Sequence, residues 1–339
     1  MKTPPRRPRL TRRDELHAIL AWYGENIFGR LEGPGVLPYY CDPARVGWFA
    51  VSPEELRRGD EGALFQLLVG MTMFQARRDV VIMRQQRQFS RALVRGLASS
   101  SALQQAIARN RCACLESAGT FDQGCDVYKD GGAVDCAHRP GTKCHVKSAT
   151  RAFNRMGDMG KVPTSAWLHL QRDGGFKALV EGALERRLRP TQRAATLVEN
   201  VSSCYRIGRK LATMFVSALS TSALAPGLAP WFPEVDGNTL VIVDTNVARA
   251  VDRLRLSGVA RSYAAREAWV RERAASLDLR QFHRELPKHS PRIVQQALYA
   301  FCSRSNRVAQ GDKCARLQAG RACEACAPAL CPFAPGRGQ

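Results

Sequence analysis

The feature that most constrains the fold is helical periodicity with almost no strand signal. Apolar residues recur every three or four positions over most of the chain, as they do along one face of an amphipathic helix. The segments expected to be helical are 11–23, 53–73, 79–110, 164–187, 190–201, 209–224, 246–256, 260–276 and 290–302. The only clear β-branched run, 239–243, is interpreted as a buried extended entry to the next helix. We therefore predict an all-α fold.

One segment departs from this pattern. Residues 111–163 are rich in glycine, cysteine and aspartate and have little periodicity. The segment is too long for an ordinary connection between two helices. We predict that 111–163 is an irregular, cysteine-rich insertion.

The charge of the chain predicts a polyanionic partner. Lys and Arg number 51 against 30 Asp and Glu, which gives a formal net charge of +21 over 339 residues. Such an excess favours nucleic acid, with an affinity that falls steeply as salt rises. A generally basic or ribosome-associated surface is the alternative.

No segment has the pattern of a signal peptide or a membrane span. The basic, proline-rich residues 1–10 are not followed by an apolar region. The small apolar stretch 218–232 is broken by Pro226, Gly227 and Pro230. We expect a cytoplasmic protein, nucleoid-associated if bacterial, with no membrane partner. In that reducing compartment, twelve cysteines indicate metal or cluster ligation more than disulfides.

Four cysteines near the C-terminus have the spacing C-x8-C-x2-C-x4-C. They are Cys314, Cys323, Cys326 and Cys331. Four thiolates so close together can hold an iron–sulfur cluster or a structural zinc ion, and the spacing alone does not choose between them. Cys302 lies just upstream and is an alternative to Cys314 as a ligand.

A second group of possible ligands lies in the insertion. The candidates are Cys125, Cys136, His138 and Cys144, with Cys112, Cys114 and His145 in the same segment. Zinc would order a segment that has few apolar residues of its own. The alternative is a loop with free thiols, since the spacing fits no standard zinc finger.

Residues 203–216 predict a basic turn between two helices. Gly208 lies at the turn, where a side chain would block a close backbone approach. The helix that follows begins with free backbone N–H groups, which suit a phosphate oxygen. Arg206, Arg209 and Lys210 add positive charge. An ordinary helix–turn–helix connection with a basic surface is the alternative.

Asp244 follows three apolar residues and precedes an amphipathic helix. Aspartate is a good helix N-cap, and that role alone would explain its position. The functional alternative is an ionised carboxylate that faces a developing positive charge.

These features, in this order, resemble the endonuclease III branch of the helix-hairpin-helix (HhH-GPD) DNA glycosylase superfamily. The chain has CYRIGRKLA at 204–212, then VDTN at 243–246, then its four C-terminal cysteines. The segment LFQLLVGMTMFQARRD at 64–79 is also similar to the early core helix of that family and its glutamine-bearing turn. The resemblance covers about 55–110 and 164–333.

The resemblance implies a two-domain helical fold that holds a 4Fe–4S cluster. The expected parts are a basic arm at 1–10, a cluster domain at 11–55 and 244–339, and a core domain at 56–243. The core domain would carry the hairpin at about 200–222 and the insertion at 111–163.

The resemblance also implies roles for single residues. Lys210 aligns with the lysine nucleophile of the bifunctional members, and Asp244 with the carboxylate that stabilises the charged sugar. Gly208 and its neighbours would hold a phosphate, and Gln75 would fill the gap left by the flipped base. The chain departs from the family pattern at Arg206, which replaces a glycine, and at Tyr205, which replaces a proline.

The function expected on these grounds is removal of a damaged or mismatched base from double-stranded DNA by a monomer, with abasic-site lyase activity in base excision repair. Two alternatives stay open. One is a monofunctional glycosylase in which Asp244 activates water. The other is a non-catalytic DNA-binding or redox-responsive protein on the same scaffold.

Overall fold

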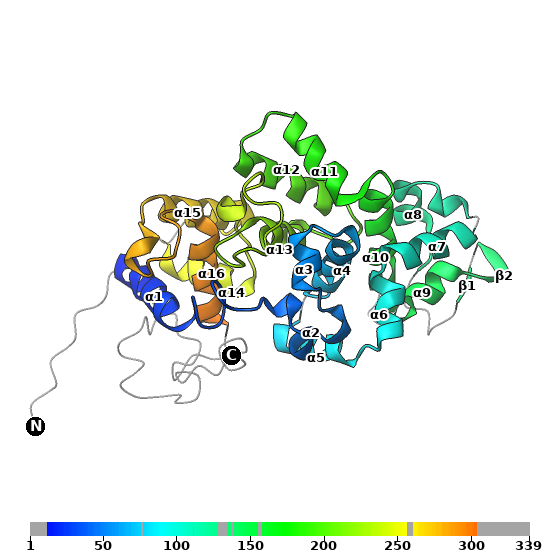
Figure 1. Cartoon of the computed structure of the whole chain (residues 1–339), viewed down its shortest axis with the longest axis horizontal. Coiled ribbons are helices and arrows are strands. Elements are labelled where there is room, and N and C mark those ends of the chain that lie inside the picture. Colours follow the sequence, from blue (N-terminus) through cyan, green and yellow to red (C-terminus); the bar gives the residue numbers. More distant parts are fainter. Residues whose placement is uncertain are drawn as a thin grey trace, which may run out of the picture. The chain divides into compact units, whose positions relative to one another are not determined.

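The computed structural model describes residues 12–75, 77–110, 112–127, 134–136, 138–154, 158–255 and 260–303 (Figure 1). Helices account for most of these residues, and two short strands form one antiparallel sheet. The all-α class is therefore confirmed. The chain divides into two compact units, Leu37–Leu240 and the pair of segments Met1–Val36 and Val241–Gln339.

The Leu37–Leu240 unit, called the core unit below, holds most of the elements. In chain order its helices and strands are α2 Pro43–Val46, α3 Pro53–Arg57, α4 Glu61–Thr72, α5 Asp79–Gln88, α6 Arg91–Ala98, α7 Ser100–Asn110, α8 Ala118–Gly124, β1 Asp135–Cys136, β2 Arg139–Lys143, α9 His145–Asn154, α10 Val162–Ala166, α11 Gly175–Glu185, α12 Pro190–Ser202 and α13 Arg209–Ser220. Short 3-10 turns, η1 Tyr39–Cys41, η2 Gly47–Phe49, η3 Ala113–Leu115, η4 Asp158–Lys161 and η6 Gly237–Thr239, and the π-helical turn η5 Trp167–Gln171 join them.

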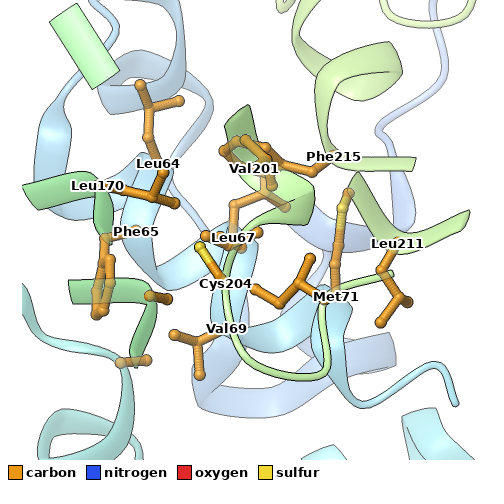
Figure 2. Close-up of a cluster of buried hydrophobic side chains, with 14 of the residues drawn as sticks. Leu64, Phe65, Leu67, Val69, Met71, Leu170, Val201, Cys204, Leu211 and Phe215 are labelled. Carbon is orange, nitrogen blue, oxygen red and sulfur yellow. The ribbon is translucent and has the colours of Figure 1, made fainter. Parts of the chain in front are cut away.

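Helix α4 is the centre of the core unit. Asp60 begins it, since its Oδ1 accepts a hydrogen bond from the N–H of Ala63 at 2.9 Å. Nearly every side chain from there to Thr72 is buried, as expected of a helix that is apolar on all faces. Figure 2 shows Leu67 and Met71 of α4 in one cluster with residues of the α12–α13 region. Side chains of the central helix therefore pack against the α12–α13 region that contains the predicted hairpin.

Serine and glycine residues divide three of the expected helices. The stretch 79–110 forms three helices, because Ser90 caps α6 through a bond from the N–H of Leu93 and Ser99 separates α6 from α7. The stretch 164–187 is interrupted at Gly174 and Gly175, which both have positive φ. The stretch 53–73 is divided before Asp60.

The insertion contains more regular structure than its sequence predicts. It holds α8, the β1–β2 hairpin and α9, so the expectation of an irregular segment is wrong for these parts. Helix α9 packs against α6 and α7, and its Val146 and Phe153 are buried. Phe153 packs against Phe49 and Phe89 of the core unit. The strands are exposed and polar. They therefore lack the alternation of apolar and polar residues by which a strand is recognised in a sequence.

The second unit is a helical cluster around α16. Its described helices are α1 Arg12–Asn26, α14 Thr245–Leu254, α15 Tyr263–Ala275 and α16 Pro291–Cys302, with the 3-10 turn η7 Leu279–Gln281. Helix α16 packs against the other three and begins at the cap Ser290. Trp22 of α1 meets Phe301 of α16 edge to face, with ring centroids 5.2 Å apart. Residues 241–243 are buried, lie outside helices and strands, and lead into α14.

The first division between the units falls after Val36, whereas the resemblance placed 11–55 with the second unit. Residues 37–55 belong to the core unit because Tyr40, Val46, Phe49 and Val51 are buried in its hydrophobic cluster. None of the helices in the described ranges is long and apolar enough to cross a membrane.

Candidate nucleic-acid site

The segment predicted as a hairpin lies between α12 and α13, which pack against each other. Six residues, 203–208, join the two helices. Two of them, Cys204 and Ile207, are buried and fix the turn to the core. Arg206, Gly208 and Arg209 are exposed. The connection therefore presents its backbone and its basic side chains to solvent.

The left-handed residue of the turn is Arg206 and not Gly208. Arg206 has φ of 60°, a conformation that costs a residue with a Cβ about 1–2 kcal/mol. This is the position at which the resembled family has a glycine. Gly208 has an extended backbone, φ −71° and ψ 170°, and a Cβ there would meet no protein atom within 4 Å. The fold itself therefore does not require a glycine at 208, and only an approaching ligand would.

Three predicted residues are brought together at the end of α4. The Nε2 of Gln75 donates a hydrogen bond to the carbonyl oxygen of Arg206 at 3.3 Å. The Nζ of Lys210 donates to the carbonyl oxygen of Phe74 at 3.1 Å. The glutamine-bearing turn and the hairpin, more than 130 residues apart in sequence, thus exchange two hydrogen bonds.

A second support holds the hairpin from α10. The N–H of Tyr205 donates to Ser165 Oγ at 2.8 Å. The ammonium group of Lys161, which is buried, lies 4.6 Å from the centre of the Tyr205 ring. That ammonium also donates to the carbonyl oxygen of Asp122 at 2.6 Å. Tyr205, at the position of the family's proline, therefore has its own structural role.

Asp244 is the N-cap of α14. Its Oδ1 accepts a hydrogen bond from the N–H of Val247 at 2.7 Å, so the capping interpretation is confirmed. Val241, Ile242 and Val243 are buried immediately before it. Asp244 lies in the second unit and Lys210 in the core unit, and the structure describes each within its own unit.

The four C-terminal cysteines, Cys314, Cys323, Cys326 and Cys331, lie outside the described residues. Cys302, the alternative ligand, ends α16 and is buried. Its carbonyl oxygen accepts a hydrogen bond from Arg249 of α14 at 2.9 Å.

The insertion places its cysteines on four different elements. Cys114 lies in η3, Cys125 follows α8, Cys136 ends β1 and Cys144 precedes α9. The Sγ of Cys144 accepts a hydrogen bond from the N–H of Lys147 at 3.4 Å. His138 is engaged otherwise, because its Nε2 lies 2.8 Å from the carbonyl oxygen of Gly124.

No three His, Cys, Asp or Glu side chains among the described residues are arranged as a metal site. The eight described cysteines are free thiols. Burial raises the pKa of Cys125 to about 12 and also raises the pKa of Cys144. These thiols are therefore protonated at neutral pH, and a zinc ion would have to displace their protons.

One polar network was not anticipated from sequence. His169 Nε2 pairs with Asp122 Oδ2 at 2.9 Å, and its Nδ1 lies 3.4 Å from the Oγ of Ser203. The partners of His169 are 47 and 34 positions away, and no local pattern relates them. The network links α8, the π-helical turn η5 and the first residue of the hairpin.

The connection between α12 and α13 is thus hydrogen-bonded to Phe74 and Gln75 in the turn after α4, and to Ser165 of α10. Its exposed surface is a helix N-terminus flanked by arginines, which is chemistry suited to a phosphate group. We compared the chain with models of protein families, with curated proteins and with solved structures, and none of them matches it.

Proposed function

We propose that the protein is a DNA glycosylase that removes a damaged or mismatched base and cleaves the resulting abasic site through Lys210. The observation that carries the proposal is the pair of hydrogen bonds between the hairpin and the Phe74–Gln75 turn. They hold the proposed nucleophile and the proposed gap-filling glutamine on the same few residues of the core unit.

The proposed chemistry needs the target base outside the stack, because the sugar C1′ is not accessible within a duplex. The Nζ of Lys210 would attack C1′ as the bond to the base breaks, and the electron pair of that bond would leave with the base. Loss of a proton from that nitrogen and cleavage of the C1′–O4′ bond, with O4′ taking up a proton, would then give the Schiff base. The Schiff base would acidify the neighbouring C2′ position and permit β-elimination of the 3′ phosphate. The hydrogen bond to Phe74 would have to be released for the attack.

Asp244 is proposed to stabilise the positive charge that develops on the sugar as the base departs. An ionised carboxylate at a position fixed before the reaction provides this without reorganisation. Its place at the start of α14 fixes its orientation. Arg206, Gly208 and Arg209 are proposed to hold a DNA phosphate at the N-terminus of α13. The net charge of +21 supports a double-stranded DNA partner.

We also propose that Cys314, Cys323, Cys326 and Cys331 would hold a 4Fe–4S cluster. Four thiolates are the donor set that such a cluster requires. Its role here would be structural, and no chemical step is assigned to it. Zinc in the insertion, held by Cys125, Cys136, His138 and Cys144, stays a prediction.

The deciding experiment is borohydride trapping on duplex DNA that contains an abasic site. Wild-type protein should form a covalent complex, and Lys210→Ala should abolish it while duplex binding persists. The matched control is Arg209→Ala, which removes the adjacent cation and should weaken binding but leave trapping intact. Trapping that survives Lys210→Ala would reject the role of this lysine.

A monofunctional glycosylase is the second candidate, favoured by the same hydrogen bond between Lys210 and Phe74. If that bond persists on DNA, the amine is occupied and Asp244 would instead activate a water molecule. Base release without strand cleavage from a lesion-containing duplex would identify this case. Duplex binding without base release or trapping on any lesion would leave the non-catalytic alternative.

A further inference from the structure

The core unit carries a basic groove that is separate from the hairpin. It consists of two adjoining hollows along α6, with volumes of about 810 and 360 Å³. Trp48, Gln66 and Arg91 line the larger hollow, and Arg109 and His145 line the smaller one. Arg95 lines both hollows, so they form one continuous surface. None of the hairpin residues contributes to it.

Trp48 is the feature that makes the groove unusual. Its side chain is 54% exposed, whereas Trp22, Trp167 and Trp231 are buried and Trp269 is half-buried. The exposure does not come from a loose segment. Gln66 of α4 donates to the carbonyl oxygens of Trp48 at 3.3 Å and Ala50 at 2.9 Å.

The two chain neighbours of Trp48 are also fixed. Phe49 is buried in the aromatic cluster with Phe89. Gly47 has φ of +60°, and a Cβ there would lie 2.9 Å from the Cα of Arg87. The backbone is therefore anchored on both sides of an indole ring that faces solvent. An aromatic side chain held rigidly in water has the form of a stacking platform.

The charge of the groove has one sign. Arg91 and Arg95 lie four residues apart on α6 and are exposed, as is Arg109 on α7. No Asp or Glu of the described chain lines either hollow or forms an ion pair with these three arginines. The guanidinium of Arg91 lies 5.4 Å from the centre of the Trp48 ring. A flat ring with a cation above it and further cations along a groove suits a base followed by its phosphates.

The floor of the groove leaves room for such a ligand. It is made largely of small residues, among them Ala92, Ala102 and Ala149. Helix α6 approaches α9 closely, because a Cβ on Gly96 would lie 2.9 Å from the carbonyl oxygen of Ala149. This contact fixes α6, and with it Arg91 and Arg95, against the rest of the core unit (Figure 1).

We propose that this groove binds single-stranded nucleic acid, with an unpaired base stacked on Trp48 and the adjoining phosphates on Arg95 and Arg109. Duplex DNA is the poorer fit, because its bases are stacked on each other and their faces are not available to an indole ring. An acidic protein segment would satisfy the arginines but would make no use of the exposed part of the Trp48 ring. The inference does not depend on glycosylase activity.

The test uses the fluorescence of the full-length protein on addition of a twelve-nucleotide oligothymidylate. Since Trp48 is the one tryptophan with an exposed side chain, stacking should quench a distinct part of the emission. Trp48→Ala should weaken binding by about five- to hundredfold and remove that quenching, whereas Trp48→Phe should retain most of the affinity. Arg95→Gln should make the slope of log affinity against log salt concentration less steep by about 1. The control is Arg186→Gln, an exposed arginine of the same unit outside the groove.

The competing occupant is tested with polyglutamate of matched charge. Equal affinity for polyglutamate and oligothymidylate would overturn the proposal in favour of an acidic protein partner. Unchanged oligothymidylate binding in Trp48→Ala would overturn it as well. Borohydride trapping by Trp48→Ala is measured separately on duplex DNA with an abasic site. Failure of the glycosylase proposal and failure of this one therefore give different results.

Discussion

The Nζ of Lys210 donates a hydrogen bond to the carbonyl oxygen of Phe74 at 3.1 Å and joins the start of α13 to the turn after α4. The side chain is half-buried, and its terminal amine is the atom to which the proposed chemistry assigns the nucleophilic attack. The same contact thus concerns both stability and function. The two have to be measured separately before the trapping experiment can be interpreted.

We expect Lys210→Ala to lower the free energy of unfolding by only about 1 kcal/mol. One hydrogen bond is lost, and water can replace the ammonium at a half-buried carbonyl oxygen. Urea denaturation of the wild type and the variant measures this difference. A loss of more than about 3 kcal/mol would mean that absent trapping reflects a damaged fold.

At Asp244 the effects on stability and on catalysis can be separated, because asparagine caps helices about as well as aspartate. Asp244→Asn should keep the bond from the N–H of Val247, and its thermal stability should stay close to that of the wild type. Base release should nevertheless collapse, since the negative charge is gone. Asp244→Ala is the comparison variant and should also lose about 1 kcal/mol of stability. Full base release by Asp244→Asn would reduce this residue to a cap.

Arg206 has a strained backbone conformation, and we expect its side chain to contribute to DNA binding. Arg206→Gly relieves the left-handed φ of 60°, so stability should stay level or rise by up to about 1 kcal/mol. Duplex affinity should fall and depend less on salt. Arg187→Gly is the matched control, because Arg187 also has positive φ, at 52°, and lies outside the hairpin. It should gain stability with no change in duplex binding.

Gly208 leads to the opposite expectation. A methyl group there meets no protein atom, so Gly208→Ala should leave thermal stability within about 1 kcal/mol of the wild type. Duplex affinity should fall if a phosphate approaches the backbone at this point. A duplex titration with undamaged DNA measures it, and unchanged affinity would place the phosphate contact elsewhere.

The pair Asp252 and Arg266 should make the second unit sensitive to acid. Arg266 of α15 donates two hydrogen bonds to the carboxylate of Asp252 on α14, at 3.0 and 2.7 Å. These bonds hold the pKa of Asp252 below its ordinary value. Asp252→Asn should therefore lower stability at pH 7 by about 1–2 kcal/mol.

The sign of the pH effect follows from that direction. Because the pKa of Asp252 is lower in the folded than in the unfolded protein, the ion pair stabilises the fold fully above the unfolded-state pKa, near 4. This stabilisation is lost as the pH falls through the folded-state pKa. The difference between the wild type and Asp252→Asn should then disappear in strong acid. Asp278→Asn is the control, because its partner Arg280 is two residues away and both side chains are exposed. Denaturation curves from pH 7 to pH 3 test both variants.

Metal analysis of the purified protein should find iron if the C-terminal cysteines hold the cluster, and zinc as well if a metal ion orders the insertion. Replacing Cys323 and Cys326 by alanine should remove iron and leave zinc, whereas replacing Cys125 and Cys144 should remove zinc and leave iron. Cys204→Ala, a buried cysteine of the hairpin, should keep both metals. Iron alone in the wild-type protein would reject the zinc prediction.

The sequence by itself determined the helical class, the place of α12–α13 and the cap at Asp244, because these follow from local periodicity and capping chemistry. It did not determine the breaks at Ser90 and Ser99, since tertiary packing decides which of several local signals is used. The hydrogen bonds between Gln75, Phe74 and the hairpin, and the network of His169, join residues far apart in the chain. Only the tertiary structure decides such contacts, because they depend on how helices pack and not on any pattern along the sequence.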